Sequence, residues 1–404
     1  MIRTIGIAIL SVALVCAVII QPDEAFKASM QGLSIWWNVV FPGLLPFLVV
    51  LEMMSAFGLS RALGVLAQPL TQRFLKLPGD SGLAVAAGWM SGFPAGAETT
   101  ARLVRSNRLQ AYEGAKLLAF SHMPNPVFML VVFGAGFLHK PQLGLLLALS
   151  VWLSGLLAAS TAAVISAKPR TGPDKPAKPR SGIWRRAAEA MEDGRREDGR
   201  GFGQVLGESV TVSVQKLMVV GGLIMLASVV SRLLTLMLPE QLPGEWLQLL
   251  LPILLESHLG AYAAASADIR GMGAPVQLAL AAAALSWSGV SGILQAGQAA
   301  GGTGIKLLPL AATKLLHALL AFGVTLLLWK PALSLLQAWG VNPASSPAMA
   351  GDGTVQAPLA PAPVAFSDLP AVWPYSVAGA LFLAVAGIAA GLLLLPFIWR
   401  RRLR

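Results

Sequence analysis

The stretch WMSGFPAGAETTARLVRSNR, residues 89–108, decides the fold of this 404-residue chain. It opens apolar, breaks at Gly92, Pro94 and Gly96, and then carries a carboxylate and three arginines. Glycine and proline inside an apolar run free backbone polar groups, which a bilayer tolerates only where protein or a water-lined cavity receives them. The stretch therefore predicts a re-entrant helical hairpin over residues 82–101 rather than a plain loop or a spanning helix.

The composition predicts that lipid is the solvent of this chain. It is 55% hydrophobic and 12% charged, with a mean hydropathy of +0.68, whereas soluble domains carry about 25% charged residues. The fold class is therefore all-α, a polytopic helical protein of the cell membrane. The net charge of +11 fits basic cytoplasmic loops, and no basic patch interleaved with aromatics predicts nucleic acid as a partner. The single cysteine, Cys16, excludes an intrachain disulfide, and we expect no metal ion and no cofactor.

Apolar runs long enough to cross the bilayer recur along the chain. Each has about 20 residues, the length that spans roughly 30 Å of hydrocarbon. Eight are predicted to span: 4–20, 34–57, 117–138, 143–165, 217–238, 246–267, 305–329 and 376–399. A ninth and a tenth, 82–101 and 274–300, are broken by SGFPAG and SWSGVSG, and both are predicted to be re-entrant hairpins. Residues 246–267 could instead be half of a hairpin. The first run is interpreted as a retained helix, because no small-x-small cleavage site precedes Gln21.

Loop charges orient these runs. Residues 168–205 hold ten Lys and Arg, and the terminal WRRRLR holds four arginines, whereas 331–375 hold none. By the positive-inside rule, the first two segments and both termini are predicted to be cytoplasmic and 331–375 extracytoplasmic. The linker is expected to be disordered to about Gly199, with a membrane-surface piece near IWRRAAEAM.

The two halves repeat one order: a spanning run, a short mixed run, a glycine-broken run and a spanning run. Paired interruptions of this kind point to a transporter binding site. The repeat could be parallel or inverted. The predicted units are residues 1–33 (first helix and outer loop), 34–166 (first gate-like repeat), 167–205 (basic linker), 206–330 (second gate-like repeat), 331–375 (Pro/Ala-rich outer loop) and 376–404 (last helix and basic tail).

Polar side chains near the breaks are the candidate solute ligands. The predicted substrate-binding residues are Ser91, Gly92, Phe93, Pro94, Gly96, Glu98, Thr99, Ser121, Asn125, Ser288, Gly289, Ser291 and Gln295. Glu98 could hold a donor or a cation, or it could be a first-turn carboxylate stabilised by the helix dipole. Ser121 and Asn125 lie in SHMPNP, whose two prolines predict a break in the helix or a kink at its start.

Four charged or titratable residues inside apolar runs are the candidate coupling residues. They are Glu52, Glu256, His258 and Lys314. A charge at the bilayer centre costs roughly 2.5–3.5 kcal/mol on insertion scales, so each predicts a function or a polar contact between helices. Residues two apart do not share a helix face, so a His258–Glu256 pair is expected only if the helix breaks at Gly260. Lys314 could neutralise Glu256 or Glu98, or snorkel to the membrane surface.

Five short stretches together resemble the YlbJ-type sporulation integral membrane proteins, which carry a nucleoside-recognition (gate) domain. The stretches are FPGLLPF (41–47), LPGDSG (77–82), SGFPAGAETTARL (91–103), LLESHLG (254–260) and GVSGILQ (289–295). The resemblance implies a protein of spore-forming bacteria that is needed for spore cortex formation. SHMPNP and LLESHLG depart from the family's N-T-S-G-P-like and L-L-E-x-T-x-G-like stretches.

We expect a transporter-like protein, not an enzyme, that moves or senses a small polar solute, nucleoside-like or other, with a coupling ion. The lipid bilayer is its first partner, and the sequence leaves a homo-oligomer open. The alternatives are a non-transporting membrane scaffold and an intramembrane serine hydrolase using GVSG with His258 or His317 as base.

Overall fold

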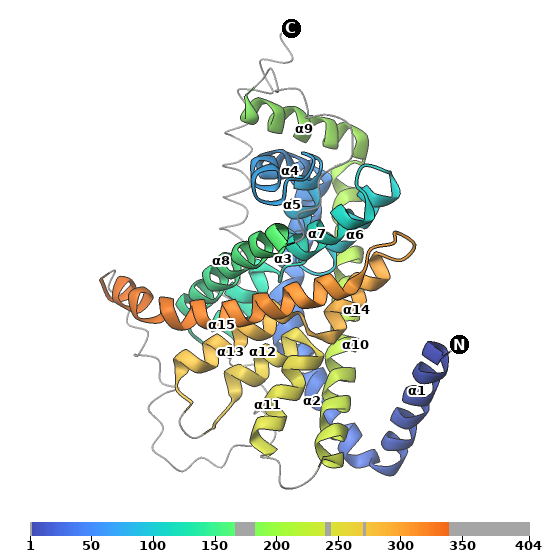
Figure 1. Cartoon of the computed structure of the whole chain (residues 1–404). Coiled ribbons are helices and arrows are strands. Elements are labelled where there is room, and N and C mark those ends of the chain that lie inside the picture. The colour runs from blue at the N-terminus through green and yellow to red at the C-terminus, as the bar shows by residue number, and fades with distance from the viewer. Residues whose placement is uncertain (1, 166–181, 239–243, 270–271, 339–404) are drawn as a thin grey trace.

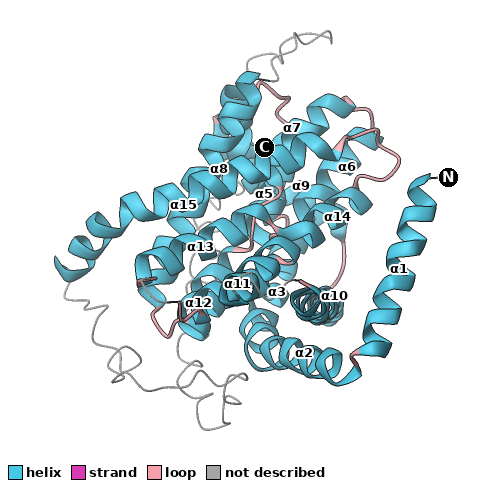
Figure 2. Cartoon of the chain, turned by 60° about the horizontal axis from the view of Figure 1, so that its bottom comes forward, coloured by secondary structure: helices cyan, strands magenta, loops and turns pink. Residues whose placement is uncertain are grey.

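The computed structural model describes residues 2–165, 182–238, 244–269 and 272–338, which form helices and loops only (Figure 2). The first half contains α1 (Ile2–Ile20), α2 (Pro22–Ile35), the π-helical turn η1 (Trp36–Val40), α3 (Phe41–Ala56), α4 (Leu59–Leu70), η2 (Thr71–Leu75), α5 (Ser81–Ser91), α6 (Ala95–Arg105), α7 (Ala111–Ser121), η3 (Phe128–Phe137) and α8 (Pro141–Ile165). The second half contains α9 (Ile183–Asp198), α10 (Phe202–Met237), α11 (Gly244–Leu255), α12 (Ser257–Ser266), α13 (Ala274–Trp287), α14 (Gly289–Ala299) and α15 (Leu307–Ala338).

Five segments of the described chain are long and apolar enough to cross a membrane: Pro22–Ala56, Pro141–Ala162, Phe202–Met237, Ala274–Ala299 and Leu307–Ser334. Four of them contain or closely match predicted crossings. The first begins at Pro22 rather than residue 34, because proline suits the first helical turn and the carboxylates of Asp23 and Glu24 stabilise its positive end. Residues 4–20 lie in α1 and are helical, but Ile5–Ile20 is a shorter apolar helix and not one of the five candidate spans. The crossing predicted at 376–399 lies outside the described residues.

Two predicted crossings are interrupted. The run 117–138 breaks between α7 and η3, where Pro124 and Pro126 cannot continue a helix. The run 246–267 breaks at Glu256, between α11 and α12, and these two helices pack against each other as α5 and α6 do. Residues 274–300 break at Ser288 as predicted, but α13 and α14 do not pack side by side like α5 and α6.

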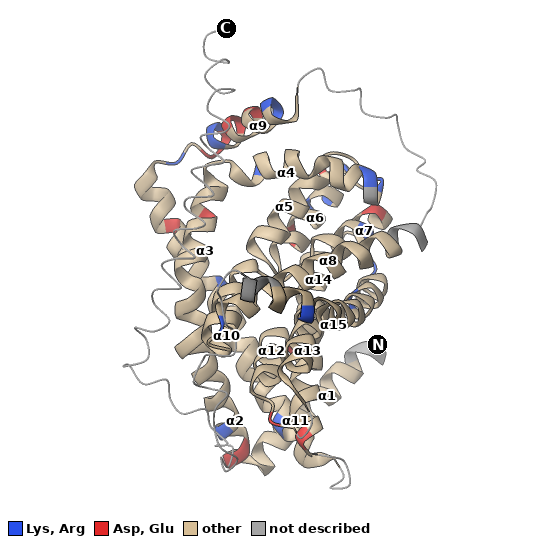
Figure 3. Ribbon diagram, turned by 90° about the vertical axis from the view of Figure 1, so that its left-hand side faces the viewer, with Lys and Arg blue, Asp and Glu red and all other residues tan. Residues whose placement is uncertain are grey.

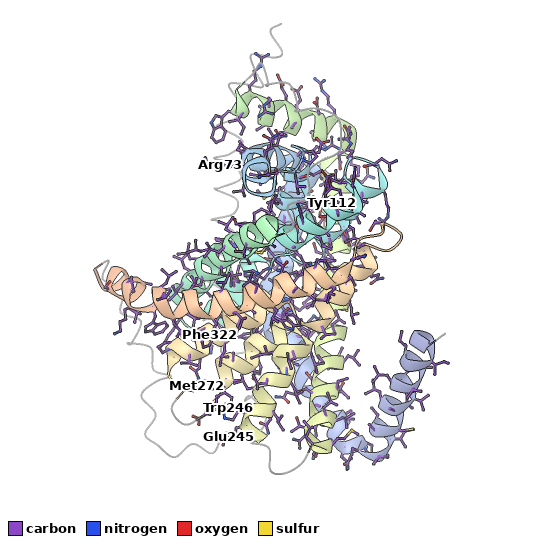
Figure 4. The ribbon with its side chains drawn as sticks, viewed as in Figure 1. Arg73, Tyr112, Glu245, Trp246, Met272 and Phe322 are labelled. Atoms are coloured by element: carbon purple, nitrogen blue, oxygen red, sulfur yellow. The ribbon has the colours of Figure 1, made fainter. Side chains whose placement is uncertain are left out.

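The long helices that open the two halves run antiparallel. Glu24 of α2 pairs with Arg232 near the end of α10 at 2.6 Å, and the ring of Phe57, just after α3, stacks on Phe202 at the start of α10. In Figure 1, α9 and α4 lie at one end of the molecule and α11 at the other. We call these the α9 end and the α11 end. Arg73 lies at the former, and Glu245 and Trp246 lie at the latter (Figure 4).

Charged residues are most frequent toward the two ends of the ribbon and sparse in the middle (Figure 3). Between the ends, α8, α13 and α15 pack on one another around a core that includes Phe128, Leu147 and Leu285. Residues 183–198 are not disordered. They form α9, which packs on α4 through the buried Ala187 and Ala188.

Glycine allows α5, α6 and α7 to approach closely. A side chain at Gly88 or at Gly96 would overlap the backbone carbonyl of Ser121. The first of these glycines belongs to α5 and the second to α6, so both arms close on the end of α7. Gly96 therefore has a packing role, which differs from its predicted place among the substrate-binding residues.

Candidate functional site

The first break, between α5 and α6, packs against the break that ends α7. Gly92 has a φ of +77°, and a Cβ added there would lie 2.7 Å from the backbone nitrogen of Asn125. The Asn125 side chain donates a hydrogen bond to the carbonyl oxygen of Ser91 at 3.1 Å, and its own oxygen accepts one from Val127 N at 2.7 Å. Asn125 thus positions the hairpin tip and begins the next helix.

His122 lies between the first break and the second. Its ring centroid is 4.3 Å from that of Phe93, and its Nε2 lies 3.5 Å from where a Cβ on Gly292 would stand. Ser288 Oγ borders the same point at 3.2 Å. Only 1% of His122 is exposed, and neither ring nitrogen has a hydrogen-bond partner among the described residues. The breaks at Gly92–Pro94 and at Ser288 therefore meet on this histidine.

Lys314, on α15, is fully buried and lies close to the ring of Phe93. Its Nζ is 3.5 Å from His317 Nδ1 and 5.8 Å from the Phe93 ring centroid. His317 Nε2 lies 2.9 Å from the carbonyl oxygen of Val151. It must donate there, so Nδ1 presents a lone pair to the ammonium. No carboxylate pairs with Lys314 in the described chain, so the predicted neutralisation by Glu256 or Glu98 does not occur.

Hydroxyl groups and helix ends lie around this buried basic cluster, which we define as His122, Ser288, Lys314 and His317. The hydroxyls of Ser288 and Ser291 are buried and lack a partner within the described residues. Helix α14 begins at Gly289, beside them, and α6 begins at Ala95, two residues beyond Phe93. Helix N-termini carry partial positive charge and free N–H groups. The cluster therefore combines one ammonium group with hydroxyl donors and the N-terminal ends of two helices.

Glu256 and His258 form a second buried site at the α11–α12 break. Glu256 is 3% exposed. One of its oxygens accepts from Leu259 N at 2.7 Å and the other lies 2.7 Å from His258 Nδ1. The sequence predicts this pair only with a break at Gly260. The break falls at Glu256 instead, whose extended backbone frees the pair from helix geometry. Gly289 packs on the Glu256 backbone, which links this site to the start of α14.

A cavity of about 480 Å³ opens at the α9 end, and it holds several predicted residues that do not reach the cluster. Glu52, Ser91, Glu98 and Thr99 line it. Glu98 is exposed, and Glu52 pairs with Lys216 of α10. Glu98 is therefore placed in the cavity rather than at the meeting point of the breaks.

The remaining predicted residues have other places. Ser121 is buried, and its hydroxyl lies 3.2 Å from that of Thr100, so it ties α7 to α6. Pro94 is half-buried in the first tip, and Gln295 lies on α14, one turn beyond Ser291. The cluster residues absent from the predicted substrate-binding and coupling residues are His122 and His317. The signal that could have found His122 is a titratable residue two positions before the first of two prolines in an apolar run.

The curated relative that matches this chain is the sporulation integral membrane protein YlbJ of Bacillus subtilis (strain 168). It is 33% identical over 352 residues, which cover 84% of this chain and 85% of the relative. The chain belongs to the YlbJ family of sporulation integral membrane proteins. No protein-family model matches it, and no solved structure does so significantly. The buried basic cluster and the Glu256–His258 pair are thus features of a multi-pass YlbJ family member.

Proposed function

We propose that this YlbJ family member is transporter-like and that it moves or senses a small polar solute bearing an anionic group, which binds at the buried basic cluster. The observation that carries the proposal is Lys314, fully buried with no carboxylate partner in the described chain. An unpaired buried ammonium costs several kcal/mol, and an anionic ligand at the site would relieve that cost. Neither ring nitrogen of His122 has a partner among the described residues, so its one N–H is free to donate to an anion.

A proposed internal repeat is the second argument for a transport role. We propose that residues 81–137 correspond to 244–299, a pairing that differs from the one predicted from sequence. In each, two helices that pack on each other are followed by a broken helix: α5, α6 and α7–η3 in the first, α11, α12 and α13–α14 in the second. The opposite directions of α2–α3 and α10 support an inverted rather than a parallel relation between the proposed repeats. Broken helices at the centre of such repeats form the binding sites of many transporters.

The paired helices α5–α6 and α11–α12 would then be the two re-entrant hairpins, entering from the α9 end and the α11 end. Two pairs of titratable groups are suited to coupling, one at the α11–α12 break and one between α3 and α10. Glu256 and His258 can exchange a proton, and the Glu52–Lys216 pair faces the cavity. We assign coupling to the Glu256–His258 pair first, because it is buried next to α14.

The relative's name places this family in sporulation, and we propose that the chain is needed for spore cortex formation in a spore-forming bacterium. A nucleoside is the solute that the family resemblance implies, whereas the cluster favours a solute with an anionic group. The serine hydrolase alternative has no support from geometry: Ser291 Oγ lacks a histidine partner among the described residues.

Binding can be tested on purified protein in nanodiscs by thermal unfolding with a panel of small carboxylates, phosphate and uncharged nucleosides. We expect at least one anion to raise the Tm of the wild type by roughly 2–5 °C and to leave Lys314→Met unchanged. Lys330→Met is the matched control, because Lys330 lies exposed on the same helix. Stabilisation by uncharged solutes alone, or equal stabilisation of Lys314→Met, would contradict the proposal.

A further inference from the structure

We propose that the ring of Phe93 is the gate that separates the cavity at the α9 end from the buried basic cluster. The inference rests on the proposed function in one respect, that the cluster receives a solute. It adds the residue that controls access from the α9 end.

Phe93 lies between the cavity and the cluster. Ser91 and Ala95, two positions before and after it, line the cavity. Its ring centroid lies 4.3 Å from that of His122 and 5.8 Å from Lys314 Nζ. Phe93 itself is half-buried, whereas His122 and Lys314 are almost completely buried. Exposure thus falls from the cavity to the cluster across one side chain.

The chain around Phe93 allows its ring to move without unfolding a helix. α5 ends at Ser91 and α6 begins at Ala95, so Phe93 sits in the short turn between them. The hydrogen bond from Asn125 to Ser91 fixes the end of α5 rather than the ring. The ring itself makes a tilted aromatic pair and a cation–π contact near the outer limit of about 6 Å.

A ring held by such contacts can swing toward the cavity while its hairpin stays in place. Motions of this kind gate many binding sites. The bulk of residue 93 should therefore set how readily water-borne reagents and solutes reach Ser288 and His122. Truncation at this position removes the contacts of the ring with His122 and Lys314 and should open the path to the cluster.

The test measures access and needs no solute. Cys16 is replaced by serine, Ser288→Cys is the probe, and the protein in nanodiscs is exposed to a charged, membrane-impermeant methanethiosulfonate. We expect slow modification of this probe with Phe93 in place and modification at least about tenfold faster with Phe93→Ala. Phe93→Leu, which keeps most of the bulk, should stay slow.

Two controls separate gating from damage. Glu98→Cys, in the cavity, should be labelled at the same rate whether residue 93 is Phe or Ala. Equal rates would show that Phe93→Ala leaves the fold intact. Phe57→Ala removes another aromatic at the α9 end, one that stacks on Phe202, and should leave the Ser288→Cys rate unchanged. Equal rates for Ser288→Cys with Phe93 and Phe93→Ala, or the same acceleration by Phe57→Ala, would overturn the gate. Because labelling requires no transported solute, the labelling rates test the gate even if the proposed function is wrong.

Discussion

Arg105 donates hydrogen bonds to the carbonyl oxygen of Ala299 at 2.7 Å and to that of Gly301 at 3.0 Å. It thereby joins the C-terminal end of α6 to that of α14. These two helices begin beside the buried basic cluster, so the arginine fixes at one end a pair of helices whose other ends face the site. A cation at a helix C-terminus also stabilises the exposed carbonyls there.

Replacing Arg105 by alanine should loosen this link. We expect Arg105→Ala to lower the free energy of unfolding by about 1–2 kcal/mol, because two hydrogen bonds to a charged donor are lost. Thermal unfolding in nanodiscs, followed by tryptophan fluorescence, measures it. Arg108→Ala, which removes an exposed pair with Asp80 at 2.8 Å, is the control and should cost at most about 1 kcal/mol. Equal effects of the two substitutions would argue against the link.

Lys314 should stabilise the protein when an anionic solute is bound and destabilise it slightly when the site is empty. Lys314→Met removes a buried unpaired ammonium and keeps the volume of the side chain. We expect the unliganded variant to unfold at the same temperature as the wild type, or to be more stable by about 1 kcal/mol. The same variant should lose all stabilisation by anions. A strongly destabilised Lys314→Met would show that the lysine has a structural partner instead.

Glu256 should stabilise the fold in two ways, as the N-cap of α12 and as the partner of His258. Glu256→Ala removes the acceptor for Leu259 N and the partner of His258, and we expect a loss of about 2–4 kcal/mol. Glu256→Gln keeps an acceptor and should lose less. Thermal unfolding separates the two, with Glu245→Ala at the exposed start of α11 as control. If the alanine and glutamine variants unfold alike, the cap contributes little and the charge of the carboxylate accounts for the loss.

The docking of α9 should depend on pH through Glu197, outside the membrane spans. A hydrogen bond from Arg61 at 2.5 Å, followed by the charge of that guanidinium, lowers the pKa of Glu197 below its ordinary 4.5. Because the docked value is the lower one, the stabilisation is fully present above pH 4.5. It is lost as the pH falls through the docked value.

Spin-label mobility at Ala190→Cys, in a Cys16→Ser chain, follows this docking across the pH range. We expect mobility to rise in acid, and Glu197→Gln to be mobile at neutral pH with a weaker dependence on pH. Glu189→Gln, which affects a pair with Arg185 inside α9, should behave as wild type. An unchanged pH profile in Glu197→Gln would assign the effect to other groups.

The apolar runs and the first break follow from the sequence, because glycine and proline in a greasy segment have few other interpretations. The place of Glu98 does not. Gly96 must face Ser121 for α6 to pack on α7, and Glu98, two residues on, then lies about 200° around the helix and faces the cavity. His122 was missed because proline neighbours explain a kink without it. The break at Glu256 was missed because no glycine or proline stands at that position.

The central claim is that the two helix breaks meet at a basic site that receives an anionic solute. Transient currents from proteoliposomes on a solid-supported membrane test it most directly, with concentration jumps of small carboxylates and phosphate. We predict a current for the wild type and for Lys330→Met with at least one anion, and none for Lys314→Met. A current of wild-type size in Lys314→Met, or no current with any anion in the wild type, would contradict the account.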